Sequence, residues 1–394
     1  MTSENKSTNS QAYTLVSDDE GLTILCNQFQ QASWVAIDTE FEREKTYYPE
    51  LCLVQLSDGE NVAIIDPLKI NDLSPLKQLL YSVSIRKIFH AARQDLEIFY
   101  FLWGSLPENI FDTQVAAPLL GYDEQAGYAK LVQNIIGVSL EKAHTRTNWK
   151  KRPLSQDQLQ YAADDVIYLA KIYPMMLESL KNCGRTHWLD DEFAAFADPA
   201  LYEIDPGQYL KRVKNARKLN AKKRELLKKL IAWREELAKK ENRPRNWILR
   251  DEALVDIAGL APQEYATLSS LKALKPADIE IYSKSILEIC QSTNCKPLTS
   301  SSKEATPRPL STDEKVLCDT LSVVVKVIAS ENNLNPAILA PQKELEKFVR
   351  NEKPCSLTNG WRKELLEYPL RQFLLGESSL IINSGKPEIK KIKN

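Results

Sequence analysis

The first half of the chain alternates short apolar runs with polar breaks, which is the pattern of β-strands. Three such runs follow one another at residues 33–41, 51–58 and 61–68. The Asp58-Gly59 pair between the last two predicts a hairpin turn. Helix-like and strand-like segments then alternate over 73–104, and the segments over 112–180 are helical. We therefore expect a mixed α/β sheet domain at residues 1–205.

From about residue 208 the pattern becomes helical only. Leu226, Leu230, Trp233 and Leu237 recur at helical spacing, with Lys and Arg between them. A stretch rich in Pro, Ser and Thr then separates this region from further helical segments. Beyond the α/β domain we expect a helical domain at 206–295, a linker at 296–312, a second helical domain at 313–380 and a disordered tail at 381–394.

Charge divides the chain in the same way as the periodicity. Residues 1–210 hold 17 basic and 30 acidic residues, a net charge of −13, whereas residues 211–296 hold 20 and 11, a net charge of +9. Within 211–250 there are 16 basic and 4 acidic residues. A basic face of this kind is typical of a partner with a phosphate backbone, although a solvated helical surface gives the same composition.

Composition also narrows the kind of site. Seven cysteines without a C-x-x-C pair argue against a zinc ribbon or a disulfide framework, and three histidines argue against a His-rich metal site. Oxygen ligands for a hard cation fit better. No apolar stretch reaches the ~18 residues of a membrane helix, and the polar start lacks the layout of a secretion signal. We expect an intracellular, cytoplasmic protein.

An acidic cluster stands at the end of the first strand, in "WVAIDTEFE". Asp38 and Glu40 are two residues apart and share one face of that strand. Asp95 lies in the first turn of a predicted helix, and Tyr161 and Asp165 are stacked at i and i+4 of a later one. Taken singly, each residue also has an ordinary structural explanation. Asp38 and Glu40 fit the solvated end of a strand, and Asp95 fits a carboxylate that the helix dipole favours. Tyr161 fits a core aromatic, and Asp165 fits a solvated helix position. Together, four carboxylates can hold two Mg²⁺ ions for phosphoryl displacement.

Three motifs carry a resemblance to a known family. They are "DTEF" at 38–41, "HAARQDLEIF" at 90–99 and "RTNWKKRPLSQDQLQYAADDVIYL" at 146–169. They resemble the DnaQ-like 3′–5′ exonucleases of the DEDD type, in the tyrosine-containing subgroup, and within it the bacterial ribonuclease D family. The segment at 230–258 is similar to an HRDC domain, and "GWRKELLEYPL" at 360–370 to a second HRDC-like unit.

The resemblance implies a ribonuclease H-like (DnaQ-like) α/β exonuclease domain with a mixed sheet, followed by two all-α HRDC-like domains. It implies that Asp38, Glu40, Asp95 and Asp165 hold two Mg²⁺ or Mn²⁺ ions, with Asp38 bridging both. Tyr161 would orient the attacking water. The expected enzyme trims 3′ trailers of tRNA precursors and other small structured RNAs and releases nucleoside 5′-monophosphates. Nothing in the sequence requires more than a monomer. A DNA exonuclease and an RNA-binding protein with an inactive site are the alternatives.

Eight further residues are candidates for substrate contact. They are Phe41, His90, Arg93 and Gln94 beside the acidic motifs, and Lys222, Lys223, Arg224 and Arg245 in the basic stretch. Phe41 fits a core aromatic equally well, His90 a structural histidine, and Arg93 an ion pair with a carboxylate. Trp233 and Trp247 are expected to be core residues of the helical domain, so that the basic side chains would carry the attraction to phosphate.

Overall fold

The computed structural model describes residues 13–140, 147–294 and 308–392. Within these ranges, no helix has both the length and the apolar character needed to cross a membrane. Most of the predicted linker at 296–312 lies outside the described residues. The six cysteines in the described part of the chain form no disulfide.

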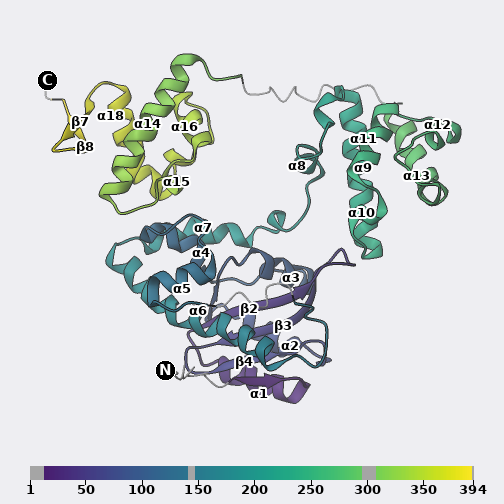
Figure 1. Cartoon of the computed structure of the whole chain (residues 1–394), viewed down its shortest axis with the longest axis horizontal. Coiled ribbons are helices and arrows are strands. Elements are labelled where there is room, and N and C mark those ends of the chain that lie inside the picture. The colour runs from purple at the N-terminus through teal and green to yellow at the C-terminus, as the bar shows by residue number, and fades with distance from the viewer. Residues whose placement is uncertain (1–12, 141–146, 295–307, 393–394) are drawn as a thin grey trace, which may run out of the picture.

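A six-stranded mixed sheet forms the centre of the first domain (Figure 1). Its strands are β1 (Thr14–Val16), β2 (Trp34–Glu42), β3 (Glu50–Ser57), β4 (Val62–Ile65), β5 (Arg86–Phe89) and β6 (Ile110–Asp112). They are ordered β1-β4-β3-β2-β5-β6; β3 runs antiparallel to β2 and β4, and the other neighbours are parallel. The expected mixed sheet and the turn at Asp58 are therefore confirmed, whereas β1 was not predicted.

Helices cover both faces of this sheet. They are α1 (Asp19–Phe29), α2 (Ser74–Leu80), α3 (Arg93–Trp103), α4 (Thr113–Ala116), α5 (Tyr128–Ile136), α6 (Gln156–Asn182) and α7 (Asp190–Ala194). On one face, α6 buries Ala162 and Val166 in the same apolar cluster as Ile64 and Ile88 of the sheet. On the other face, α1 and α3 pack against the sheet in a second cluster. The end of β2 therefore lies between two helical layers.

The second domain is helical, as its periodicity predicts. Its helices are α8 (Pro206–Leu210), α9 (Ala221–Glu241), α10 (Arg245–Ile248), α11 (Asp251–Leu260), α12 (Tyr265–Ser269) and α13 (Pro276–Asn294). Leu226, Leu230 and Ile257 are buried in its core. Trp233 is partly buried there, but Trp247 is 54% exposed, so the expectation that Trp247 is a core residue is wrong. The short helix α10 directs its indole outward because Ile248 and Leu249 fill the core position beside it.

The C-terminal unit is also helical, but it ends in a hairpin. It holds α14 (Thr312–Glu331), α15 (Pro336–Leu339), α16 (Gln342–Val349), α17 (Gly360–Arg362) and α18 (Tyr368–Leu374), then β7 (Ser378–Asn383) and β8 (Lys386–Lys391). The predicted disorder from residue 381 is therefore wrong as far as residue 391. Leu380 pairs with Ile389 across the hairpin, and Ser384 and Gly385 make its turn at φ 52° and 79°.

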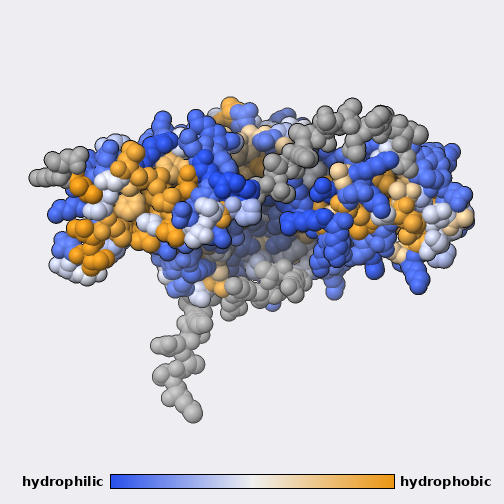
Figure 2. Space-filling model, turned by 90° about the horizontal axis from the view of Figure 1, so that it is seen from above, coloured by the Kyte–Doolittle hydropathy of each residue, from blue (hydrophilic) through white to orange (hydrophobic). Residues whose placement is uncertain are grey.

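Both helical units contact the α/β domain. Trp361 of the C-terminal unit stacks on Trp188 with ring centroids 4.8 Å apart. Asn242, the C-cap of α9, accepts hydrogen bonds from the backbone N–H groups of Tyr47 and Tyr48 through its Oδ1, each at 3.1 Å. Figure 1 shows the two helical units on the same side of the sheet domain, and Figure 2 shows apolar residues gathered on the C-terminal unit, where Leu375 is 71% exposed.

Candidate active site

Three of the predicted carboxylates converge at the end of β2. Asp38, Glu40 and Asp165 each offer an oxygen, and these oxygens all lie within 4.8 Å of one another. The convergence follows from two periodicities. Alternation along β2 places Asp38 and Glu40 on the face that α6 covers, and α6 presents Asp165 to the same face.

Asp95 approaches from the opposite side of the sheet. It lies in the first turn of α3, and its Oδ1 accepts a hydrogen bond of 2.5 Å from Thr39 Oγ1. Thr39 points to the α3 face because it falls between Asp38 and Glu40 on the strand. A tight turn between β5 and α3 sets this geometry. There the Asp112 carboxylate accepts from the backbone N–H groups of Ala91 (3.0 Å) and Ala92 (2.8 Å).

The four carboxylates repel one another in a poorly solvated place. Burial, followed by the charge of Asp165, raises the pKa of Asp38, and burial followed by Asp38 raises that of Asp95. Burial and the neighbouring acids raise the pKa of Glu40 to about 10, and burial and Asp164 raise that of Asp165 to about 7. Such a cluster is costly unless a cation neutralises it. An all-carboxylate donor set suits a hard divalent ion, so the residues present fit the metal that the motifs imply.

Tyr161 lies one turn before Asp165 on α6 and is half-buried, with its ring centroid 6.2 Å from that of Trp149. Burial and the nearby carboxylates raise the pKa of Tyr161 further above its usual value, so its hydroxyl keeps its proton. Tyr128 is a neighbour that the motifs did not indicate. Its hydroxyl donates to the backbone carbonyl of Asp165 at 2.5 Å. No local pattern marks Tyr128, because α5 meets α6 only in the folded chain.

The remaining candidates near the cluster have diverse surroundings. His90 Nδ1 lies 3.0 Å from Thr113 Oγ1, and burial lowers the pKa of His90 to about 4, so the ring is neutral at pH 7. Phe41 is half-buried against the α3-side core, and Gln94 is exposed. Arg93 donates to the carbonyl of Leu201 at 3.0 Å, and it forms no ion pair with a carboxylate of the described residues.

The basic candidates belong to the second domain. Lys222 and Arg224 are exposed in the first turns of α9, and Lys223 is partly buried there. Arg245 lies over the ring of Tyr209 and lines, together with Arg93, a cavity of about 410 Å³ between the first two domains. Four acidic residues line the same cavity, so it is of mixed charge: Glu97, Asp198, Glu203 and Asp205.

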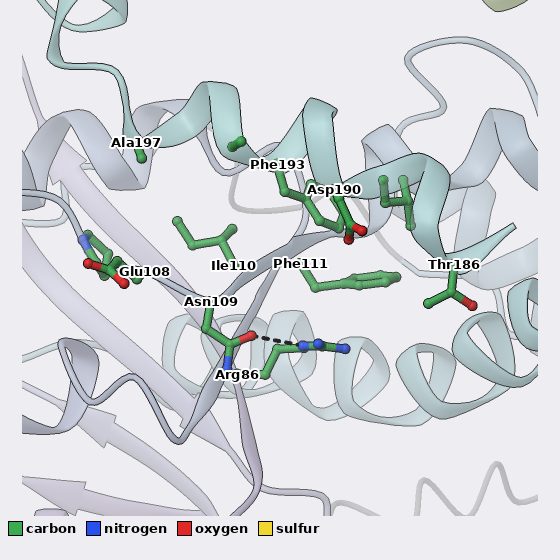
Figure 3. Close-up of a pocket in the computed structure, with 12 residues that line it drawn as sticks. Arg86, Glu108, Asn109, Ile110, Phe111, Thr186, Asp190, Phe193 and Ala197 are labelled. Carbon is green, nitrogen blue, oxygen red and sulfur yellow. Dashed lines mark hydrogen bonds between the residues drawn. The ribbon is translucent and has the colours of Figure 1, made fainter. Parts of the chain in front are cut away.

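A different cavity of about 400 Å³ opens between β6 and α7 (Figure 3). Arg86 at the start of β5 donates from Nε to Asn109 Oδ1 at 3.1 Å, and Phe111 and Phe193 line the same space. It lies near the starts of β5 and β6, whereas His90 and the Asp95 turn follow the end of β5. None of the clustered carboxylates lines it.

Comparison with known proteins shows which sequences and domains this chain is similar to. Residues 13–181 match the family model of a 3′–5′ exonuclease domain, and residues 210–290 match that of an HRDC domain. The chain is 35% identical over 384 residues to the ribonuclease D of Bartonella henselae. The aligned region covers 96% of this chain and 94% of the relative. The chain belongs to the ribonuclease D family. The ribonuclease D of Acidiphilium cryptum is 37% identical over 379 residues, or 95% of this chain and 96% of that one.

A solved ribonuclease D extends the likeness to three dimensions. The crystal structure of Escherichia coli RNase D, an exoribonuclease involved in structured RNA processing, matches with a TM-score of 0.77 and 30% identity. The match covers 93% of this chain and 99% of that one, so it includes the C-terminal unit. As a member of the ribonuclease D family with an intact acidic cluster, the chain is a metal-dependent 3′–5′ exoribonuclease.

Proposed function

We propose that this ribonuclease D trims the 3′ trailers of tRNA precursors and other small structured RNAs, and releases nucleoside 5′-monophosphates. The observation that carries the proposal is the convergence of Asp38, Glu40 and Asp165 on one point, with Asp95 beside them. Carboxylates from a strand and from helices on both sheet faces have no structural reason to meet there. Their mutual repulsion destabilises the fold, and a bound cation removes this repulsion.

The proposed ligands are two Mg²⁺ or Mn²⁺ ions. Asp38 would contact both, because it lies between Asp165 on α6 and the Asp95 side of the sheet. Glu40, Asp95 and Asp165 would be the other ligands. When bound, the ions supply Lewis-acid stabilisation of the phosphoryl oxygens and acidify a water molecule.

Tyr161 is proposed to orient the attacking water. Its hydroxyl stays protonated at neutral pH, because burial and nearby carboxylates raise its pKa. A protonated phenol positions a water by hydrogen bonding but is no general base at pH 7. Tyr128 is proposed to hold the α6 backbone at Asp165 through the hydrogen bond to that carbonyl.

The HRDC domain is proposed to hold the RNA backbone near the acidic domain. The exonuclease part repels a polyanion outside its metal site, since residues 1–210 carry a net charge of −13. Residues 211–250, with 16 basic and 4 acidic side chains, provide attraction that salt weakens. Lys222, Lys223, Arg224 and Arg245 are the proposed contacts. We propose that the enzyme acts as a monomer in the cytoplasm, where the unpaired cysteines of the described residues are compatible with a reducing environment.

A product assay with matched substrates tests this proposal. A 5′-labelled RNA hairpin with a single-stranded 3′ tail, and its DNA equivalent, are incubated with Mg²⁺ or with chelator. We expect a ladder of single-nucleotide steps from the 3′ end of the RNA, and none with chelator or with Asp38→Ala. A ladder on DNA alone would overturn the substrate. RNA binding without a ladder would overturn the catalytic role of the cluster.

A further inference from the structure

A buried amide without a partner lies in the middle of β3. Gln55 is 0% exposed, and among the described residues neither its Nε2 nor its Oε1 has a hydrogen-bond partner. A buried polar group in this state is unfavourable compared with an apolar side chain of the same shape. Gln55 therefore weakens the metal-free fold, and its presence calls for a partner that forms in another state of the protein.

The sheet register shows which group can be that partner. Gln55 is directly opposite Asp38 on the antiparallel strand β2 and opposite Ile64 on β4. Residues opposite each other in this way share a face and have Cβ atoms about 5 Å apart. The side chains along the same face, Ala36, Leu53 and Ile64, belong to the apolar cluster under α6. Asp38 is thus the polar side chain directly opposite the Gln55 amide.

We propose that Gln55 is a positioning residue for Asp38. Its Nε2–H donates a hydrogen bond to one oxygen of the Asp38 carboxylate and so turns the carboxylate toward Glu40 and Asp165. This inference rests on the proposed function, in which Asp38 is a metal ligand. A carboxylate that binds a cation is ionised and accepts hydrogen bonds on its remaining lone pairs, and donors that fix it in this way strengthen metal binding.

The proposal predicts opposite effects on stability and on metal binding. Gln55→Leu removes the amide and keeps much of the side-chain volume, so the metal-free protein should unfold at the same temperature as wild type or higher. The same change leaves Asp38 without its donor, so Mn²⁺ affinity should fall about tenfold. A purely structural role for Gln55 predicts the reverse, namely lower stability and unchanged metal affinity.

The experiment is Mn²⁺ titration calorimetry together with thermal unfolding in chelator, on the full chain and four variants. These are Gln55→Leu, Gln55→Met as a second apolar replacement in case leucine prevents folding, Asp38→Asn, and Ile64→Val as the matched control. Ile64 lies opposite Gln55 on the same face. Loss of one methyl group in Ile64→Val should therefore lower stability and leave Mn²⁺ affinity unchanged.

The outcomes separate this inference from the proposed function. Weaker Mn²⁺ binding by Gln55→Leu or Gln55→Met, without loss of metal-free stability, supports the positioning role. Unchanged Mn²⁺ affinity in both Gln55 variants, with binding lost in Asp38→Asn, overturns the role of Gln55 alone. Unchanged affinity in Asp38→Asn overturns the metal site and this inference with it.

Discussion

At the scale of single residues, the site depends on side chains that are unfavourable until a cation binds. Asp165 illustrates this, since burial and the neighbouring Asp164 raise its pKa to about 7. A carboxyl group whose pKa is higher in the folded than in the unfolded chain stabilises the fold only while it is protonated. That contribution is complete below about pH 4 and is lost as the pH rises through about 7.

The first prediction follows from the upward shift of the Asp165 pKa in the folded chain. In chelator, Asp165→Asn should be more stable than wild type at pH 8, by on the order of 1–3 kcal/mol, because the amide cannot ionise. The difference should vanish near pH 4, where Asp165 is protonated as well. Urea unfolding at the two pH values measures it. An equal difference at both pH values would contradict the account of the charge cluster.

Tyr161→Phe is the second prediction. Removal of the hydroxyl should lower kcat by about 10- to 100-fold, because the water loses its orienting hydrogen bond. Affinity for Mn²⁺ and for RNA should stay the same, since Tyr161 is proposed to contact neither. The pH–rate profile should keep its shape, because the phenol carries its proton throughout the neutral range. A profile that loses its acidic limb in Tyr161→Phe would mean that this tyrosine acts as a base.

The sequence indicated the carboxylates but not the residues that support them. Asp38, Glu40 and Asp165 have recognisable spacing within one strand and one helix. Thr39, Tyr128 and Gln55 meet the site only through packing between elements distant in sequence, such as the pairing of β2 with β3. The prediction that Trp247 is a core residue was wrong for another reason: helical periodicity does not reveal which side of a four-residue helix faces the core.

At the scale of elements, the turn from β5 into α3 determines where Asp95 lies. Ala91 adopts φ 62°, which is unfavourable for a residue with a Cβ atom. The buried Asp112 carboxylate stabilises this conformation by accepting from the backbone N–H groups of Ala91 and Ala92, and from Gln114 N at 2.8 Å. The turn therefore depends on one side chain from β6.

The third prediction concerns this turn. Asp112→Ala should lower stability by about 2–4 kcal/mol, because several buried N–H groups lose their acceptor. It should also weaken Mn²⁺ binding, since α3 would no longer hold Asp95 in place. The matched control is Asp205→Ala, which removes an exposed N-cap of α8 and should cost about 1 kcal/mol without affecting Mn²⁺. Wild-type Mn²⁺ affinity in Asp112→Ala would show that the turn does not position the site.

The spacing of apolar residues alone predicted whether most segments are helices or strands. It did not predict the strands near the two ends of the chain. The hairpin of β7 and β8 lies in a lysine-rich segment whose composition resembles a disordered tail. Its alternation around Leu380 and Ile382, followed by Ser384-Gly385, is nevertheless a hairpin pattern. The strand β1 has only three residues and gains its stability by pairing with β4, which no local pattern shows.

At the scale of the whole molecule, an acidic catalytic domain is joined to a basic helical one. The HRDC domain also contacts the loop that follows β2, through Asn242 and the Tyr47 backbone N–H, and the buried Tyr47 ring belongs to the HRDC core. The proposed attraction to the RNA backbone and the contact with the loop after β2 would thus come from the same domain. The charge difference predicts that RNA affinity depends strongly on salt.

The fourth prediction tests this division of charge. The double change Lys222→Glu and Arg224→Glu should weaken RNA binding several-fold at low salt and flatten its dependence on salt concentration, because two phosphate contacts are lost. Mn²⁺ affinity should be unchanged. Lys326→Glu with Lys343→Glu, on exposed positions of the C-terminal unit, makes the same change in net charge elsewhere. Equal loss of RNA affinity in both double variants would contradict a specific docking role for α9.

The central claim is that the carboxylates at the end of β2 hold the metal ions of an exoribonuclease. Anomalous scattering from crystals of the full chain grown with Mn²⁺ tests it most directly. The account predicts two peaks about 4 Å apart, bounded by the carboxylates of Asp38, Glu40, Asp95 and Asp165, and no peak there in crystals of Asp38→Asn. Mn²⁺ bound elsewhere, with no peak among these carboxylates in the wild type, would contradict it.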